Sequence, residues 1–290
     1  MHIRRPLPRT VPAIGAAVLL SACEPGVFDP VGPVAGGEHL ILIDSLAIML
    51  AIVVPVIVAT LGFAWWFRSG NAKARYRSEW SYSGRLELLV WAVPALVVIF
   101  LGGIAWISSH DLDPARPIAG GRALRVEVVS LDWKWLFIYP DLGVASVNRL
   151  VVPAGQAVSF RLTSATVMNS FFVPRLGSQI YTMAGMTTVL NLRADRPGAY
   201  RGLSANYSGK GFPGMAFTVY ALPTGQFATW IAGARRQGPV LDGRNYMTLL
   251  RDSQNVAPYT YRAVAGGLFD AVVRDSGTRT ARVAVDGKAR

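Results

Sequence analysis

Side chains that could hold a redox metal are scarce in this chain and are confined to its N-terminal part. The histidines are His2, His39 and His110, and the only cysteine is Cys23. Copper sites that carry electrons are built from thiolates and imidazoles, with a thioether as a weak further ligand. Residues 122–290 contain no histidine and no cysteine. That part of the chain therefore has the ligands for neither a dinuclear copper centre nor a mononuclear blue-copper site.

Cys23 follows a segment with the three parts of an export signal. Arginines lie near the start, an apolar stretch covers residues 11–20, and small residues precede the cysteine. The sequence Leu-Ser-Ala-Cys that ends at Cys23 resembles the bacterial lipoprotein box, in which diacylglycerol alkylates the thiol. We expect residues 1–22 to be removed as a signal peptide and Cys23 to carry the lipid. The alternative is a chance cysteine after an ordinary signal peptide.

Two acidic side chains lie beside apolar stretches. Glu87 lies just inside Arg85, at a membrane boundary where a carboxylate is costly and often functional. The simpler alternative is an interfacial acid that pairs with Arg85 or a neighbour, and position alone does not choose between the two. Asp44 precedes the first stretch and is predicted to be a helix N-cap without a further role.

The two apolar stretches are long enough to cross a membrane. Residues 45–67 hold no charged side chain, and at about 1.5 Å per residue they suffice for a hydrocarbon core of about 30 Å. A second span covers about residues 86–107, with Trp91 and Trp106 near its ends as interface anchors. Residues 23–110 are therefore predicted to form a transmembrane hairpin.

The charges around the hairpin predict its orientation. The connection between the spans holds one acid, Glu79, and five basic residues: Arg68, Lys73, Arg75, Arg77 and Arg85. Residues 23–67 contain no lysine or arginine. By the positive-inside rule the connection is cytoplasmic, which leaves both ends of the mature chain on the periplasmic side. This agrees with the lipoprotein box, because lipidation occurs on the outer face of the inner membrane.

The pattern changes to short strands in residues 122–222. The predicted strands are 124–131, 135–139, 149–152, 158–162, 170–173, 187–192, 199–204 and 215–221. Strands this short and regular predict a Greek-key sandwich or barrel. Residues 223–290 are predicted to be a helical extension, with short helices at 227–235, 246–252 and 263–274 and a loose tail from Asp275.

The composition agrees with a chain divided between membrane and water. Of its 290 residues, 52% are hydrophobic and only 16% are charged, and the mean hydropathy is +0.34. The formal net charge is +12. Nucleic acid is nevertheless a poor candidate ligand, because the basic residues form no run interleaved with aromatics.

Three motifs carry a resemblance to a known family. They are the run from Glu87 to Pro94, the run Ser-Leu-Asp-Trp-Lys-Trp over residues 130–135, and the run Ser-Phe-Phe-Val-Pro-Arg-Leu-Gly over residues 170–177. They resemble the second helix, the aromatic region and a cupredoxin strand and loop of subunit II of haem–copper oxidases. The resemblance covers about residues 40–222 and extends into the C-terminal helices in the quinol oxidase branch, of the cytochrome bo type. It implies a membrane hairpin followed by a periplasmic cupredoxin-like domain.

The family's copper ligands can be compared with this sequence position by position. The cytochrome c branch binds a dinuclear copper centre through an upstream His and the run Cys-x3-Cys-x3-His-x2-Met. The four ligand positions before the methionine fall here on Asn169, Leu203, Tyr207 and Gly211. Met215 remains, offset by one residue. We expect Leu203 and Tyr207 to fill by packing the space that the metal fills in the relatives.

The glycines around Gly211 have a rival interpretation as a phosphate-binding loop. This is disfavoured, because neither a following helix nor the Lys-Ser/Thr ending of such loops is present.

The resemblance implies a non-catalytic subunit of a proton-pumping ubiquinol oxidase. A domain without copper has no relay from cytochrome c, so a membrane quinol is the expected electron donor. No cofactor is expected in this chain, and the haems and copper are expected in subunit I. The expected partners are subunit I, further oxidase subunits and membrane lipid, without cytochrome c or nucleic acid.

The resemblance also assigns roles to Glu87, Trp133 and Trp135. In the family, the matching Glu lies at the entrance of the proton channel that leads to the large subunit. Trp133 and Trp135 are predicted to share one side of a strand, where aromatic side chains either pack in the core or meet a partner. Because the copper that receives electrons in the relatives is absent, packing against the large subunit is the preferred interpretation. The main alternative to this function is a free-standing lipoprotein binding module, which the hairpin disfavours because a lipoprotein already has an anchor.

Overall fold

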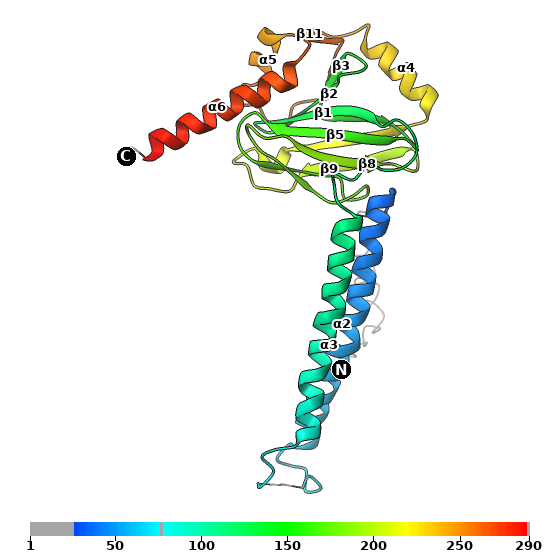
Figure 1. Ribbon diagram of the computed structural model, residues 1–290, viewed down its shortest axis with the longest axis vertical. Coiled ribbons are helices and arrows are strands. Elements are labelled where there is room, and N and C mark those ends of the chain that lie inside the picture. Colours follow the sequence, from blue (N-terminus) through cyan, green and yellow to red (C-terminus); the bar gives the residue numbers. More distant parts are fainter. Residues whose placement is uncertain (1–25, 76–77, 289–290) are drawn as a thin grey trace, which may run out of the picture.

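The chain consists of a pair of long helices and a β domain at one end of the pair (Figure 1). The computed structural model describes residues 26–75 and 78–288, with side chains up to Thr278. Cys23 and the predicted signal peptide lie outside the described residues. Helices α2 (Pro33–Trp66) and α3 (Gly84–Asp111) run side by side from the β domain to the connection between them.

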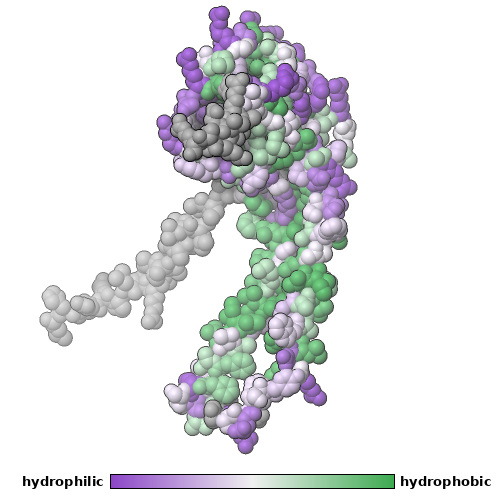
Figure 2. Space-filling view, turned by 60° about the vertical axis from the view of Figure 1, so that its left-hand side comes forward, coloured by the Kyte–Doolittle hydropathy of each residue, from purple (hydrophilic) through white to green (hydrophobic). Residues whose placement is uncertain are grey.

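Both predicted spans are helical, and both helices are longer than predicted. At about 1.5 Å per residue, 34 residues of α2 and 28 of α3 exceed the roughly 20 needed to cross a bilayer. Their mean hydropathies are 2.8 and 2.5 over the most apolar windows. Figure 2 shows the apolar side chains on the outside of the pair. By length and composition, both helices can cross a membrane.

The prediction that Asp44 caps the first helix is wrong. Asp44 lies inside α2, which begins at Pro33 after the extended residue Gly32. Proline is favoured in the first turn, because its missing N–H would have no helical partner there. The additional turns connect the span directly to the β domain, where Ala35 is buried and its N–H donates to the carbonyl of Leu176 at 3.2 Å.

The residues before α2 are fastened to the β domain. The N–H of Val31 donates to the carbonyl of Arg175, and the N–H of Asp195 donates to the carbonyl of Val31, both at 2.8 Å. Asp29 forms ion pairs with Arg175 and Arg196. These contacts fix the position of the domain relative to the start of α2.

The β domain is a sandwich of two mixed sheets. The first has the order β12-β3-β2-β1-β5-β8 and the second has the order β4-β10-β9-β6-β7. The first sheet comprises β1 (Leu124–Leu131), β2 (Lys134–Tyr139), β3 (Val144–Val147), β5 (Ala157–Ser164), β8 (Thr188–Arg193) and β12 (Tyr259–Tyr261). The second comprises β4 (Arg149–Pro153), β6 (Asn169–Phe172), β7 (Ile180–Thr182), β9 (Gly198–Ser204) and β10 (Ala216–Leu222). All the predicted strands are present, and β3, β7 and β12 were not predicted.

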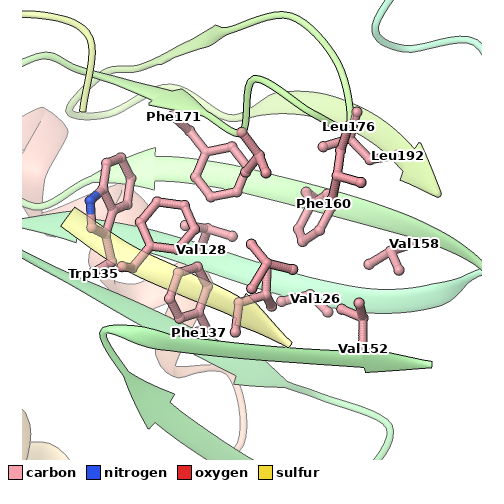
Figure 3. Packing of buried hydrophobic residues seen from close by; sticks show 14 of the residues in the cluster. Val126, Val128, Trp135, Phe137, Val152, Val158, Phe160, Phe171, Leu176 and Leu192 are labelled. Carbon is pink, nitrogen blue, oxygen red and sulfur yellow. The ribbon is translucent and has the colours of Figure 1, made fainter. Parts of the chain in front are cut away.

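Aromatic side chains from both sheets fill the space between them (Figure 3). Trp135 is fully buried, with its ring 5.5 Å from Phe171 and 5.6 Å from Phe217. Phe171 and Phe217 stack at 5.1 Å, and Phe137 and Phe160 contact the same group. Burial of rings of this size supplies most of the hydrophobic stabilisation of a small sandwich.

The C-terminal extension differs from its prediction in two places. Helices α4 (Thr224–Ala234) and α5 (Gly243–Leu249) agree with it, but residues 263–264 form strand β13, which pairs with β11 (Val240–Leu241). Helix α6 (Leu268–Lys288) begins later than predicted and includes the tail that was expected to be loose.

Packing on the first sheet explains why α6 is ordered at its start. Phe269 and Val272 are buried, and Arg161 of β5 bridges Glu127 and Asp270 at 3.0 Å each. Such long-range contacts are not visible in the local sequence pattern.

Candidate functional site

The four positions that the sequence comparison predicts to correspond to copper ligands of the relatives lie at one end of the second sheet. Asn169 is the first residue of β6. Leu203 lies in the neighbouring strand β9, where it pairs with Phe172 of β6. Tyr207 and Gly211 lie in the loop that connects β9 to β10. We call residues 205–215 the ligand loop. The alignment made from the sequence therefore identifies one contiguous region.

Asn169 is held in a buried polar network. Its side chain is 1% exposed, and its amide oxygen accepts a hydrogen bond from the hydroxyl of Ser204 at 3.2 Å. The amide nitrogen donates to the carbonyl of Val167 at 3.2 Å. The hydroxyl of Thr182 donates to the carbonyl of Asn169 at 3.4 Å. Buried polar groups of this kind require partners, and here the protein supplies them where a histidine would bind metal.

Trp133 packs between the ligand loop and the first sheet. It lies with Asp132 in the two-residue turn between β1 and β2, at a φ of +62°, and its indole N–H donates to the carbonyl of Ser208 at 3.0 Å. A Cβ on Gly211 would lie 2.2 Å from the indole. The loop can approach the ring this closely only because position 211 has no side chain.

The prediction that Tyr207 fills the former metal space is wrong. Its side chain is 74% exposed, with its ring against Phe212 at 5.7 Å. Leu203 is half-buried. The side chains buried at the ligand loop are Trp133 and Met215. Met215 is 2% exposed, and its sulfur accepts from the hydroxyl of Ser208 at 3.8 Å. The sequence pattern did not reveal this, because Trp133 comes from the opposite sheet.

Trp133 and Trp135 lie in the domain's own core, which contradicts their predicted role as surface aromatics that face a partner. Trp135 is fully buried and Trp133 is 8% exposed. Both belong to the same hydrophobic cluster, although Trp133 lies in the turn before β2 and not in the strand. Trp135 has no surface left for a partner, whereas Tyr207 and Tyr181 are exposed near this end of the second sheet.

The donor groups do not fit a dinuclear copper centre. The four positions supply an amide, an aliphatic chain, a phenol and a hydrogen atom, whereas that centre requires soft thiolates and imidazoles. Within residues 26–75 and 78–288, no cluster of three or more His, Cys, Asp or Glu side chains could hold a metal ion. The site can position the ligand loop, but it lacks the thiolates and imidazoles of an electron-carrying copper site.

The donor set leads to a prediction about metal content. The full-length chain, purified without its partners and washed with a chelator, should retain no stoichiometric copper, because residues 122–290 contain neither His nor Cys. Metal analysis by mass spectrometry makes the measurement. Copper near one or two equivalents after the wash would show that the ligand comparison is wrong.

A buried lysine that the sequence analysis did not single out joins the C-terminal extension to the turn. Lys134 is 1% exposed, and its ammonium donates to the carbonyl of Arg251 and the hydroxyl of Ser253 at 2.7 Å each. Burial lowers the pKa of Lys134 below its usual value, and the carboxylates of Asp132 and Asp252 oppose this shift. The available signal in the sequence was a lysine at the start of an otherwise apolar strand, between two tryptophans.

Glu87 lies in the first turn of α3, at the end of the hairpin that is distant from the β domain. Its side chain is exposed, and in the part of the chain that the structure describes no ion pair joins it to Arg85. The pairing alternative therefore receives no support from the structure. A carboxylate in a first turn is stabilised by the helix dipole. The predicted proton role is untested by these observations.

Comparison with known proteins identifies relatives of both parts of the chain. Residues 141–222 match the family described as "Cytochrome C oxidase subunit II, periplasmic domain". The "Ubiquinol oxidase subunit 2" of Acetobacter aceti is 44% identical over 263 residues, which cover 90% of this chain and 85% of that protein. The "Cytochrome bo(3) ubiquinol oxidase subunit 2" of Pseudomonas aeruginosa is 44% identical over 89% of this chain and 78% of that protein.

Among solved structures, the periplasmic domain of subunit II of cytochrome oxidase from Bradyrhizobium japonicum is similar to this chain. The TM-score is 0.39 at 23% sequence identity, and the match covers 41% of this chain and 98% of that one.

Proposed function

The chain belongs to the ubiquinol oxidase subunit 2 family, and from this membership we propose that it serves as the copper-free subunit II of a bacterial inner-membrane oxidase that oxidises ubiquinol and reduces oxygen to water. The observation that carries the proposal is the 44% identity to a ubiquinol oxidase subunit over 90% of this chain. The haems and copper belong to the partner subunit I. The alternative of a free-standing lipoprotein module is not favoured by these relatives.

The ligand loop supports a quinol as the electron donor. Asn169 and Gly211 replace two imidazoles, and Trp133 packs where Gly211 leaves room. Electrons from a soluble cytochrome c would require a metal relay in the β domain, and residues 122–290 contain neither the thiolates nor the imidazoles of a copper relay. A quinol dissolved in the bilayer can reduce subunit I directly. The β domain then has a structural role at the periplasmic face of the complex.

The hairpin supports a role for Glu87 in proton entry. Because the β domain is at one end of α3 and Glu87 is at the other, a periplasmic β domain places Glu87 at the cytoplasmic face. The basic residues of the connection favour the same orientation. At that position an exposed carboxylate can take protons from the cytoplasm and pass them to a channel in subunit I.

Co-purification tests the proposed function. The full-length chain with a C-terminal affinity tag should retain a haem-containing partner after extraction in a mild detergent. The complex should consume oxygen with a short-chain ubiquinol and not with reduced cytochrome c, because the chain has no copper relay. Isolation of the tagged chain without haem, or oxidation of cytochrome c at a comparable rate, would contradict the proposal.

The lipid anchor is a separate proposal, since Cys23 lies outside the described residues. Asp29 is fastened to the β domain by Arg175 and Arg196. At a maximum of about 3.5 Å per residue, the short segment between Cys23 and Asp29 reaches roughly 20 Å. An acyl chain on Cys23 would thus enter the outer leaflet close to α2.

Mass spectrometry of the mature protein should find diacylglycerol on Cys23 and no residues 1–22. This prediction is based on the Leu-Ser-Ala-Cys sequence. An intact Met1 or an unmodified Cys23 thiol would contradict the prediction. Cys23→Ser should leave oxidase activity in the membrane, because two spans hold the chain more firmly than acyl chains do.

A further inference from the structure

A hollow that lies apart from the ligand loop contains a buried arginine nitrogen without a partner. The hollow has a volume of about 340 Å³ and is lined by Arg149, Val151, Tyr220, Leu222 and Trp230. Nε of Arg149 is buried and has no hydrogen-bond partner among the described residues. Leaving a buried donor unpaired is costly, so such atoms are rare in folded proteins. The rest of the Arg149 side chain lines the hollow, so a group bound there could accept hydrogen bonds from its guanidinium.

The strand register places these side chains on one face. Tyr220 of β10 pairs with Val151 of β4, and Thr218 pairs with Arg149. Since side chains alternate along a strand, Arg149, Val151, Tyr220 and Leu222 share the face opposite the buried Leu150 and Val152. Helix α4 packs against both strands and contributes Trp230. Strands β4 and β10 and helix α4 thus supply the side chains that line the hollow.

The chemistry of the lining selects a class of ligand. Arg149 is the only charged residue among the five, and its guanidinium lies over the ring of Tyr220 at 5.8 Å. The other members are apolar or aromatic. A guanidinium is planar and presents its N–H groups as a fork, which matches a carboxylate in a two-point contact. Phosphate is a poorer match, because a dianion in this apolar setting would require several donors.

We propose that the hollow between β4, β10 and α4 binds a carboxylate attached to an aromatic or other apolar group. The Arg149 guanidinium pairs with the carboxylate, and Tyr220, Leu222 and Trp230 contact the apolar group. A volume of about 340 Å³ suits a small ligand of this kind, near the lower limit of known ligand pockets. Helix α4 is on the side of the domain that faces away from α2 and α3 (Figure 1), so the ligand comes from the periplasm and not from the bilayer.

Titration of the purified full-length chain in a neutral detergent tests the site, with sodium phenylacetate as the probe and phenylacetamide as its uncharged counterpart. Calorimetry should show saturable binding of one phenylacetate and much weaker binding of the amide. Arg149→Met should weaken phenylacetate binding at least about tenfold, equivalent to ~1.4 kcal/mol. The affinity of Arg149→Lys for phenylacetate should lie between those of wild type and Arg149→Met. Lysine keeps the positive charge but lacks the planar fork of N–H groups.

Arg244→Met is the matched control, because Arg244 is an exposed arginine in α5. It should leave the affinity for phenylacetate unchanged. Equal binding of phenylacetate and phenylacetamide, or equal affinity of wild type and Arg149→Met, would overturn the proposal. So would the absence of saturable phenylacetate binding.

The assembled oxidase distinguishes two sources of the carboxylate. If the probe binds both the free chain and the assembled oxidase, the ligand is a diffusible periplasmic carboxylate. If it binds only the free chain, a neighbouring subunit supplies the carboxylate in the complex. Both results support the site, and neither depends on whether the complex oxidises ubiquinol.

Discussion

Replacing Trp135 with alanine should lower the free energy of unfolding of the β domain by about 3–5 kcal/mol, the range for large aromatic-to-alanine changes in cores. The ring is fully buried between the sheets and contacts Phe171 and Phe217. Its removal leaves a cavity that these strand-borne rings cannot fill. The loss of near-ultraviolet dichroism on heating the full-length protein in detergent measures the effect as a lower melting temperature.

Two controls separate cavity formation from other effects of the substitution. Tyr207→Ala removes an aromatic ring that is 74% exposed, and it should change stability by no more than about 0.5 kcal/mol. Trp135→Phe removes an indole N–H that is buried without a hydrogen-bond partner among the residues that the structure describes, and it keeps much of the ring volume. It should therefore lower the free energy of unfolding far less than Trp135→Ala does. A melting temperature of Trp135→Ala equal to that of Tyr207→Ala would contradict the assignment of Trp135 to the core.

Glu87→Ala should slow quinol oxidation several-fold in membranes of equal haem content. A carboxylate at a channel entrance takes up protons and passes them on, and alanine can do neither. Glu87→Asp should retain part of the rate, because it keeps a carboxylate near the same position. Oxygen consumption with a short-chain ubiquinol measures the rate, and the haem spectrum verifies that the complex is assembled.

Glu79→Ala is the matched control for this experiment. Glu79 is an exposed acid in the connection that precedes α3, and its loss changes the net charge by the same amount without altering α3. It should leave the rate unchanged. If Glu87→Ala also turns over at the wild-type rate, the carboxylate has no role in proton entry, and the chain acts in the oxidase as a scaffold alone.

The sequence predicted most of the regular structure because the relevant signals are local. All predicted strands of residues 122–222 are present to within about two residues, since alternation of side chains requires only neighbouring positions. The membrane helices follow equally from two long apolar stretches. Their first turns were missed because residues 33–44 mix glycines and charged residues with apolar ones, and contact with the β domain supports them.

The failures of prediction in the C-terminal extension have one physical cause. Residues 259–264 form strands because β3 and β11 offer unpaired edges to them, and α6 is ordered at its start by Arg161 and buried Phe269. A partner strand or a packing surface that lies far away in the chain overrides local preference. No window of the sequence contains that information.

By itself the sequence determined what the β domain cannot do. Counting histidines and cysteines needs no coordinates, and the count removes copper ligation under any fold. The same holds for the two membrane spans, which depend on apolar length alone.

Only the tertiary structure decided what occupies the lost copper site and where a ligand could bind. Trp133 reaches Ser208 across 75 residues, and Asp29 is joined to Arg175 across 146. Arg149 meets Tyr220 and Trp230 because β4 pairs with β10 beneath α4. Such contacts depend on the order and register of strands, which arise when the whole chain packs and not from the residues on either side.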